Sequence, residues 1–585
     1  MQPSPPSSPP NPRPLKLARM EDSIDIVQAT TGTSSIPSYR PDAKQRRYDR
    51  QLRLWASSGQ RSLESARVLL VGCDATGCQG LKNLVLPGIQ QFTILSSAIT
   101  QPKDVATNFF LHPDSVGQPI AQEAVRLLSE LNPSVEGAAR VDDISTLLQS
   151  EPFFFTSFTL VIATNVDPDV ELALADLLWQ ASSEVGGPDI PLIAIRNSGF
   201  CGRVEIQLRE HCVVDTHPDT THTLRIDQPF PALEKHAREL DLDSMDSMEF
   251  SHVPWVVLLV RASCWWKDNH EGRYPGQDKA DDERSAERTA FKALLKAQKR
   301  KGDEENYDEA LSQAYRAWTP STVPYELQQL LETENGALVT QNSKNLHILL
   351  QALKLFLTEP PHLPPISPTL PDMHSSTTSY VALQNLYKAQ YRADLEKFKG
   401  YLAQTLSSLG LPVDAIPDDE IEGFVKNSGG VNVIKGRALR ESKEVQGGVR
   451  ALIADSFSEG NAPYEIYLPL HLAFLSAERF FSQEKRWPGT SQDGDMAEDS
   501  RKMAETVRHI IRDAAQGFSG EIGDLATNAI AEVARGGFGT LPTTAAFLGG
   551  LVGQEAIKLV TNQYNPLDNT CIVDLVQSGI EKFRF

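Results

Sequence analysis

The sequence has few cysteines and no long apolar run. Its six cysteines, among 585 residues, form no C-x-x-C pair. This usage indicates neither a disulfide framework nor a zinc signature and is typical of a reducing compartment. No run approaches the roughly 18 apolar residues of a membrane span, and the N-terminus lacks the apolar core of a secretory signal. We therefore expect a cytosolic or nuclear protein with no membrane partner.

The sequence also lacks an excess of basic residues. Its 56 Lys and Arg are outnumbered by 76 Asp and Glu, for a formal net charge of −20. A nucleic-acid-binding protein needs a basic surface to neutralise phosphates, so nucleic acid is not expected as a partner. At roughly 100–200 residues per domain, the length predicts about two to four domains.

Common metal and phosphate motifs are missing as well. The sequence has no H-E-x-x-H and no G-x-x-x-x-G-K-[ST]. The closest histidines, His211, His217 and His222, have a spacing that favours a polar strand or loop over a metal site. Cys264 lies between a serine and two tryptophans, which is more typical of a core thiol than of a nucleophile. We predict no metal site in this chain.

The chain divides into four regions. Residues 1–40 are rich in Pro and Ser and are predicted to be a disordered tail. In residues 41–214, short apolar runs at 67–71, 91–95, 158–163 and 191–195 alternate with helical patterns, which predicts a parallel, doubly wound sheet. Residues 215–515 are mainly helical and charged. In residues 516–585, a helix at 541–560 and a strand at 570–575 restore the α/β pattern. The sequence therefore predicts one α/β domain that is split by a large, mainly helical insertion.

Small residues recur every four positions in the helix predicted at 541–560. They are Ala545, Gly549 and Gly553. Because residues four apart share a helix face, this spacing predicts close backbone packing against another element.

The turn after the first strand resembles a nucleotide-binding loop with its central glycine missing. The fingerprint is G-x-G-x-x-G, and here Gly72 and Gly77 remain while Asp74 takes the middle position. A carboxylate there would narrow the pocket and repel phosphate. The second strand ends at Leu95 and Ser96 rather than in an acidic residue that could hold ribose hydroxyls. We predict that the glycines make only a tight turn. The same absences argue against a self-sufficient NAD oxidoreductase.

The helix predicted at 42–56 has two distinct faces. Tyr48, Leu52 and Trp55 form an apolar stripe, and Arg46, Arg50 and Arg53 follow at the same spacing on another face. The surrounding residues 41–55 carry a net charge of +3 in a chain of −20. Both a plain amphipathic surface helix and a phosphate-facing helix fit this pattern.

Four segments together resemble the ubiquitin-activating enzyme family. They are RYDRQLRLW at 47–55, LKNLVLPGI at 81–89, NFFL at 108–111 and AAFLGGLVGQEAIK at 545–558, and the resemblance extends from about residue 41 to the C-terminus. It implies a Rossmann-like adenylation domain of the ThiF/MoeB type, with the insertion in the place of a catalytic-cysteine domain. Active members use ATP and Mg²⁺ to adenylate the C-terminal glycine of a ubiquitin-like modifier and then form a thioester.

The chain departs from the active members of that family at several positions. Their N-R-Q-F motif reads Thr-Asn-Phe-Phe here, with Asn108 for the arginine and Phe109 for the glutamine, and no P-x-C-T surrounds a cysteine. Asp74 and Ser96 are further departures. The resemblance therefore implies a non-catalytic regulatory half of a heterodimer, which binds no cofactor itself. ATP and Mg²⁺ would be held by the partner subunit, and Arg50 would reach that ATP in trans.

The implied partners are the catalytic subunit and a ubiquitin-like modifier, with the conjugating enzyme as a further candidate. The segment HVPWVVLLV at 252–260 and the length of the insertion favour the neddylation branch over the sumoylation branch. The acidity of the insertion suggests attraction of basic partner surfaces. A non-enzymatic scaffold, which would use the helical insertion as a docking surface, remains an alternative.

Overall fold

An eight-stranded mixed sheet is the centre of the structure. The computed structural model describes residues 43–182, 189–214, 223–333, 339–457, 467–490, 496–515, 518 and 520–585, so the predicted tail at 1–40 lies outside the described residues. The strand order is β10-β9-β6-β5-β4-β1-β2-β3, parallel from β5 to β3 and antiparallel from β5 to β10. The strands are β1 (Arg67–Val71), β2 (Gln91–Leu95), β3 (Glu136–Arg140), β4 (Leu160–Thr164), β5 (Leu192–Ser198), β6 (Cys201–Gln207), β9 (Thr570–Asp574) and β10 (Gly579–Phe583).

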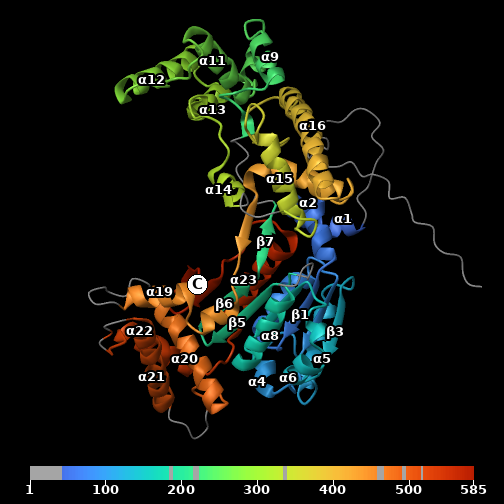
Figure 1. Ribbon diagram of the computed structural model, residues 1–585, viewed down its shortest axis with the longest axis vertical. Coiled ribbons are helices and arrows are strands. Elements are labelled where there is room, and N and C mark those ends of the chain that lie inside the picture. The colour runs from blue at the N-terminus through green and yellow to red at the C-terminus, as the bar shows by residue number, and fades with distance from the viewer. Residues whose placement is uncertain are drawn as a thin grey trace, which may run out of the picture.

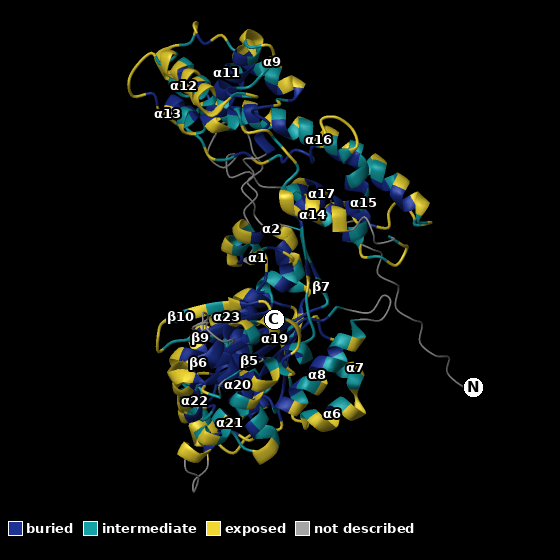
Figure 2. Cartoon of the chain, turned by 60° about the vertical axis from the view of Figure 1, so that its left-hand side comes forward, coloured by how far each residue is buried: buried dark blue, intermediate teal, exposed yellow. Residues whose placement is uncertain are grey.

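The parallel strands are those that apolar runs predict. The runs at 67–71 and 91–95 coincide with β1 and β2, and β4, β5 and β9 also form where strands are predicted. Alternate β1 residues enter different cores, since Val68 and Leu70 face one side of the sheet and Leu69 and Val71 the other. Helices cover both faces (Figures 1 and 2), so a continuous apolar run is what a central strand requires. The α/β fold is confirmed.

One α/β lobe contains the sheet and its covering helices (Figure 1). On one face lie α2, α3, α5 and α23, and on the other α6 to α8 and α18 to α22. The helices of this lobe are α1 (Ala43–Arg47), α2 (Asp49–Glu64), α3 (Ala75–Val85), α4 (Pro102–Thr107), α5 (Ile120–Ser129), α6 (Ile144–Ser150), α7 (Pro152–Phe155), α8 (Pro168–Ala181), α18 (Leu439–Lys443), α19 (Gly447–Ser456), α20 (Leu468–Glu484), α21 (Met496–Ala514), α22 (Gly523–Gly536) and α23 (Pro542–Thr561).

A helical lobe stands above the α/β lobe and has its own apolar cores (Figures 1 and 2). Its helices are α9 (Pro231–Glu239), α10 (Ser247–Ser251), α11 (Trp255–Asn269), α12 (Asp281–Ala297), α13 (Glu305–Ser312), α14 (Tyr325–Thr333), α15 (Asn345–Leu357), α16 (Thr377–Ser408) and α17 (Asp418–Asn427). The predicted insertion, 215–515, therefore has two parts in space. Its helices α9 to α17 build the helical lobe, whereas α18 to α21 pack on the α/β lobe.

A two-stranded ribbon connects the lobes. It pairs β7 (Glu210–Val213) with β8 (Asn432–Lys435) in antiparallel register. Val213 belongs to the sheet core, and its neighbour Cys212 packs against the core of the helical lobe. Charged contacts beside the ribbon add to this link, among them Arg61–Asp419 at 3.0 Å. Successive side chains of the ribbon point to opposite faces, so one face contacts the α/β lobe and the other contacts the helical lobe.

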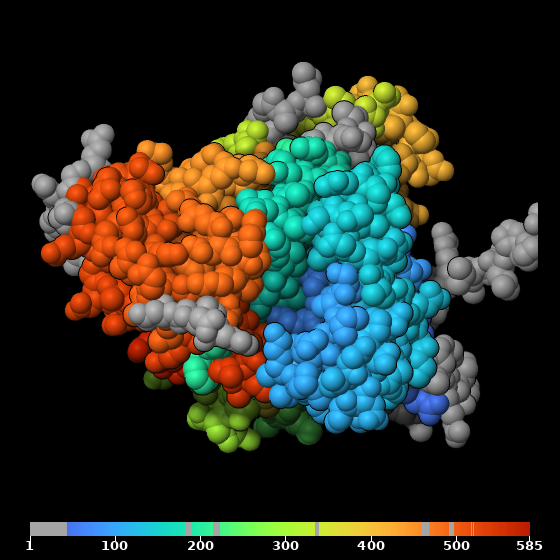
Figure 3. All heavy atoms as spheres, turned by 90° about the horizontal axis from the view of Figure 1, so that it is seen from below, coloured from blue at the N-terminus to red at the C-terminus, as the bar shows by residue number. Residues whose placement is uncertain are grey.

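Helices α3 and α23 pack closely through glycine. A Cβ at Gly549 would lie 2.4 Å from Gln79 Cβ and 2.9 Å from the Gly80 backbone nitrogen. Asn83 Nδ2 donates to the Gly549 carbonyl at 2.9 Å. The close packing predicted from the small residues is confirmed, and it joins the first part of the split domain to its last part. Seen from below, the first part of the domain (blue to teal) lies beside a mass formed by α18 to α22 and the C-terminal residues (orange to red), with a hollow between them (Figure 3).

Candidate functional site

The N-terminal helix presents Arg50 to solvent. The predicted apolar stripe faces inward, because Tyr48 and Trp55 are buried and Leu52 is half-buried. Helical geometry is interrupted at Trp55 and Ala56, where Ala56 takes a φ of 56°, so the predicted end of the helix at 56 coincides with a kink. A second helical segment follows the kink and completes α2 to Glu64. Arg50 is exposed, and no described residue takes part in a hydrogen bond or ion pair with its guanidinium. The first part of α2 is therefore anchored by Tyr48 and Trp55, while the Arg50 guanidinium is exposed and unpaired among the described residues.

Asp74 fills the turn where a nucleotide phosphate would be expected. It is the N-cap of α3, and its Oδ1 accepts hydrogen bonds from Gly77 N at 2.8 Å and from the Thr164 hydroxyl at 2.7 Å. Its Oδ2 accepts from Asn165 Nδ2 at 3.1 Å and from the Thr540 hydroxyl at 3.3 Å. A carboxylate oxygen has two acceptor positions, so both oxygens are saturated. The positive end of α3 already holds an anion, and that anion belongs to the chain.

Burial raises the pKa of the Asp74 carboxyl above its ordinary value, although the hydrogen bonds from Gly77 and Thr164 act in the opposite direction. The geometry leaves this carboxylate no free acceptor for a metal ion or for a substrate proton. More broadly, no three His, Cys, Asp or Glu side chains within the described ranges form a group that could hold a metal ion. The turn therefore has the chemistry of a structural cap.

The two glycines of the turn serve close packing. Gly72 has a φ of 88°, and a Cβ there would lie 2.6 Å from the Thr164 carbonyl oxygen. A Cβ at Gly77 would lie 2.8 Å from side-chain atoms of Leu70 and Thr164. Both glycines are needed for the approach of the turn to β4, whatever it binds. This geometry agrees with the tight turn that the sequence predicts.

Of the other three departures named in the sequence, Ser96 and Asn108 make buried structural contacts, whereas Phe109 is exposed. Ser96 is buried, and its hydroxyl accepts from Ala98 N at 3.3 Å. Asn108 is also buried and bonds to Phe110 N at 3.0 Å and to the Cys78 thiol at 3.4 Å. Phe109 is 81% exposed. None of these side chains offers a cation to a phosphate or a carboxylate to a ribose.

Similarity to known proteins agrees with this geometry. Residues 48–585 match the ThiF family. The chain is 33% identical over 541 residues to the NEDD8-activating enzyme E1 regulatory subunit of Gallus gallus, with 91% of this chain and 97% of that protein covered. It is 33% identical over 538 residues to the Drosophila melanogaster subunit, with 91% and 96% covered. The chain belongs to the family of NEDD8-activating enzyme E1 regulatory subunits.

More distant members of this regulatory-subunit family match over the same length. The Saccharomyces cerevisiae protein is 28% identical over 555 residues, with 92% of this chain and 99% of that protein covered. The ubiquitin-activating resemblance and the neddylation branch expected from the sequence are thus confirmed. No helix in the described part of the chain has the length and apolar content to cross a membrane.

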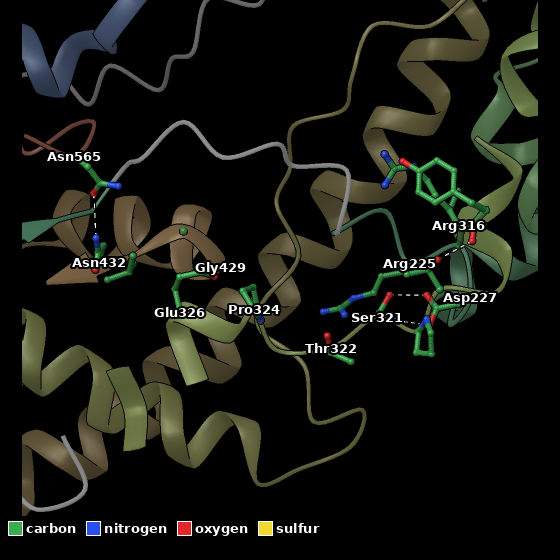
Figure 4. Close-up of a pocket in the computed structure, with 16 residues that line it drawn as sticks. Arg225, Asp227, Arg316, Ser321, Thr322, Pro324, Glu326, Gly429, Asn432 and Asn565 are labelled. Atoms are coloured by element: carbon green, nitrogen blue, oxygen red, sulfur yellow. Dashed lines mark hydrogen bonds between the residues drawn. The ribbon is translucent and has the colours of Figure 1, made fainter. Parts of the chain in front are cut away.

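Figure 4 shows a cavity of about 610 Å³, and the described residues that line it include none from the Asp74 turn. Arg225 and Arg316 line it together with Asp227 and Glu326, so its charges are mixed. Asp227 is already bonded to Ser321, whose backbone N–H and hydroxyl donate at 2.6 and 2.5 Å. Burial lowers the pKa of Arg225, whose guanidinium donates to the Pro364 carbonyl at 2.6 Å. Because Arg225 and Asp227 are both held by such contacts, we assign the cavity no catalytic role.

The two described candidates among these histidines and cysteines, His211 and Cys264, lie in separate elements, β7 and α11. Burial raises the pKa of the Cys264 thiol, which lies in the core of the helical lobe, as expected for an unreactive cysteine. Burial also lowers the pKa of His211 to about 4. His217 and His222 lie outside the described residues.

Sequence reasoning missed a buried ionic cluster behind β5 and β6. Its members are three acids and three bases, namely Glu171, Glu205, Glu478, Arg196, Arg203 and Lys443. Arg203 contacts Glu478 at 2.5 Å and Glu205 at 3.0 Å, and Lys443 contacts both acids at 2.8 Å. Burial raises the pKa of Glu478, but the charges of Arg203 and Lys443 outweigh it and hold that pKa well below its usual range. The cluster ties α18 and α20 to the sheet. The only signal in the sequence is that Arg196, Arg203 and Glu205 closely follow the strand predicted at 191–195.

Proposed function

We propose that this chain is the non-catalytic regulatory half of a heterodimeric NEDD8-activating enzyme and that it delivers Arg50 to the ATP of the catalytic subunit. In that reaction the C-terminal carboxylate of the modifier attacks the α-phosphorus, and pyrophosphate leaves. A guanidinium fork suits the negative charge that grows on the phosphate oxygens. Arg50 would act in trans, as an arginine finger does.

The main support for this proposal is the contrast between the Asp74 carboxylate and the Arg50 guanidinium. The chain's own α3 turn is filled by the saturated Asp74 carboxylate, while the exposed Arg50 guanidinium has no partner among the described residues. The α3 turn of this chain leaves no position for a phosphate, whereas Arg50 is exposed on a helix that is anchored by buried residues. This combination supports a role for Arg50 at a phosphate that is bound by the partner subunit. We propose that ATP and Mg²⁺ bind only to the catalytic subunit.

ATP–pyrophosphate exchange by the reconstituted complex tests this role. We expect Arg50→Ala to slow exchange by about 10²-fold or more, the order seen when a preorganised charge donor is removed. Arg50→Lys should recover part of the rate, because an ammonium keeps the charge but loses the fork. Size-exclusion chromatography should show unchanged assembly.

Arg53→Ala is the matched control. Arg53 lies on the same helix, one turn from Arg50, and pairs with Asp49 at 3.1 Å. Its loss should change exchange by less than about twofold, since an exposed pair contributes little. A wild-type exchange rate for Arg50→Ala in an assembled complex would overturn the proposal and favour a scaffold that uses only its docking surfaces.

A further inference from the structure

The first part of α2, residues 49–54, is held at both ends by buried contacts. We call it the arginine arm, because Arg50 lies in its first turn. At its start, the Tyr48 hydroxyl accepts a hydrogen bond from Asn132 Nδ2 at 3.0 Å. The same amide donates to the Val85 carbonyl at 2.9 Å. Tyr48 is 4% exposed, whereas Arg50, two residues later, is exposed.

Gly88 lets the turn after α3 approach this tyrosine. Its φ is 88°, and a Cβ at this position would lie 2.4 Å from the Tyr48 hydroxyl oxygen. Glycine is suited to this position because it adopts the left-handed backbone conformation and leaves room for the Tyr48 side chain. The Pro87-Gly88 turn of the degenerate nucleotide-binding unit therefore forms a seat for Tyr48.

The far end of the arm rests on the same turn. Trp55 Nε1 donates to Gln60 Oε1 at 3.3 Å, and Gln60 Nε2 donates to the Pro87 carbonyl at 3.0 Å. Gln563 Nε2 also donates to the Trp55 carbonyl at 3.0 Å. All these groups are buried. Both ends of the arm are therefore linked by hydrogen bonds to residues 85–88. A tilt of the arm would break these buried hydrogen bonds.

We infer that Tyr48 is a positioning residue, which sets the angle of Arg50 through its seat on Gly88 and Asn132. The inference rests on the proposed function of Arg50. Misplacement of a reacting or charge-stabilising group by about 1 Å can slow a reaction by about 10²-fold, so a long flexible side chain benefits from a rigid support. The degenerate nucleotide-binding unit would therefore still have a structural role, because it supports and orients the arginine arm.

The test is a double-mutant cycle in the complex with the catalytic subunit, ATP and the modifier. Tyr48→Phe removes one hydroxyl and keeps the buried ring. We expect kcat for pyrophosphate exchange to fall by about 3- to 10-fold, with unchanged KM for ATP and modifier and unchanged assembly. In an Arg50→Ala background the same change should have no further effect, because the two residues act as one unit. Gln60→Ala, at the other end of the arm, should behave in the same way.

Tyr387→Phe is the control for the loss of a buried tyrosine hydroxyl. Tyr387 donates to the Leu224 carbonyl at 2.5 Å within the helical lobe, far from the arm in the chain. Its loss should leave exchange unchanged. An equal slowing by Tyr48→Phe with and without Arg50, or a normal rate for Tyr48→Phe beside a slow Arg50→Ala, would overturn the inference alone. A normal rate for Arg50→Ala would overturn the proposed function itself.

Discussion

The Thr540 hydroxyl donates a hydrogen bond to the Asp74 carboxylate at 3.3 Å, although the two residues are 466 positions apart in the chain. The contact joins the first and last parts of the split domain at the carboxyl ends of β1 and β4, where sheets of this kind place their ligands. Here the Asp74 carboxylate is held by groups of the chain itself. The contribution of this contact to the stability of the Rossmann-like domain can be measured.

Removal of the Asp74 carboxylate should cost more than the loss of an ordinary helix cap. Asp74→Ala leaves Gly77 N, the Thr164 hydroxyl and the Asn165 amide without their acceptor, so we expect the free energy of unfolding to fall by about 2–4 kcal/mol. Asp143 caps α6 through Thr146 N at 2.9 Å on an exposed surface, and Asp143→Ala should cost about 1 kcal/mol. Chemical denaturation measures both variants. Equal losses would mean that Asp74 is only a cap.

Two adjacent glycines of α23 should respond in opposite directions to alanine. The added methyl of Gly549→Ala would meet Gln79 and the backbone of Gly80, so α3 and α23 must separate, at a cost of about 1–3 kcal/mol. Gly550 is exposed and has no atom within 4 Å of such a methyl. Gly550→Ala should raise stability by up to about 1 kcal/mol, since alanine favours the helix. Thermal unfolding midpoints report the signs, and a destabilised Gly550→Ala would contradict this account.

Neutralising one acid of the buried ionic cluster should be strongly destabilising. Glu478→Gln leaves two acids opposite three bases in a site with almost no solvent, and breaking such a buried pair costs about 3–5 kcal/mol. The exposed pair of Glu498 and Arg501, at 2.8 Å, is the comparison, where Glu498→Gln should cost less than about 1 kcal/mol. Urea titrations compare the two. Similar, small effects would show that the cluster tolerates an unbalanced charge.

His471 should make the α/β lobe sensitive to mild acid. Burial lowers its pKa from 6.5 to about 3, and it is fully buried against Phe585. Below pH 6.5 the His471 imidazole binds a proton in the unfolded chain but stays neutral in the folded chain. The free energy of unfolding therefore falls as the pH drops from 6.5 towards about 3. The slope from one such group is about 1.4 kcal/mol per pH unit. His471→Leu should therefore lose about 1 kcal/mol less than the wild type between pH 7 and pH 5.5.

Calorimetry at those two pH values checks this expectation. His211, with its pKa lowered to about 4, contributes in the same direction to both proteins, so the difference isolates His471. The same pH dependence in the variant and the wild type would contradict the assignment.

The elements with a simple repeating pattern could be predicted from the amino-acid sequence. Apolar runs located β1, β2, β4, β5 and β9, because a strand buried on both faces needs apolar residues at every position. The small residues at Gly549 and Gly553 located the close helix contact. The departures at Asp74, Ser96, Asn108 and Phe109 could likewise be seen in the letters, since each replaces a residue type that a phosphate or ribose needs.

Features that depend on residues distant in the chain could be recognised only in the folded structure. β3, with the sequence EGAAR, and β6, with CGRVEIQ, lack an apolar run; one is a sheet edge and the other has its charges paired within the ionic cluster. Lys443 of α18 and Glu478 of α20 belong to the same cluster, and α19 to α21 pack on the α/β lobe through an apolar core. Saturation of Asp74 by Thr164, Asn165 and Thr540, and the seat of Tyr48 on Gly88, also need partners from separate segments. Local pattern encodes burial, but long-range pairing of polar groups is settled only when the chain has folded.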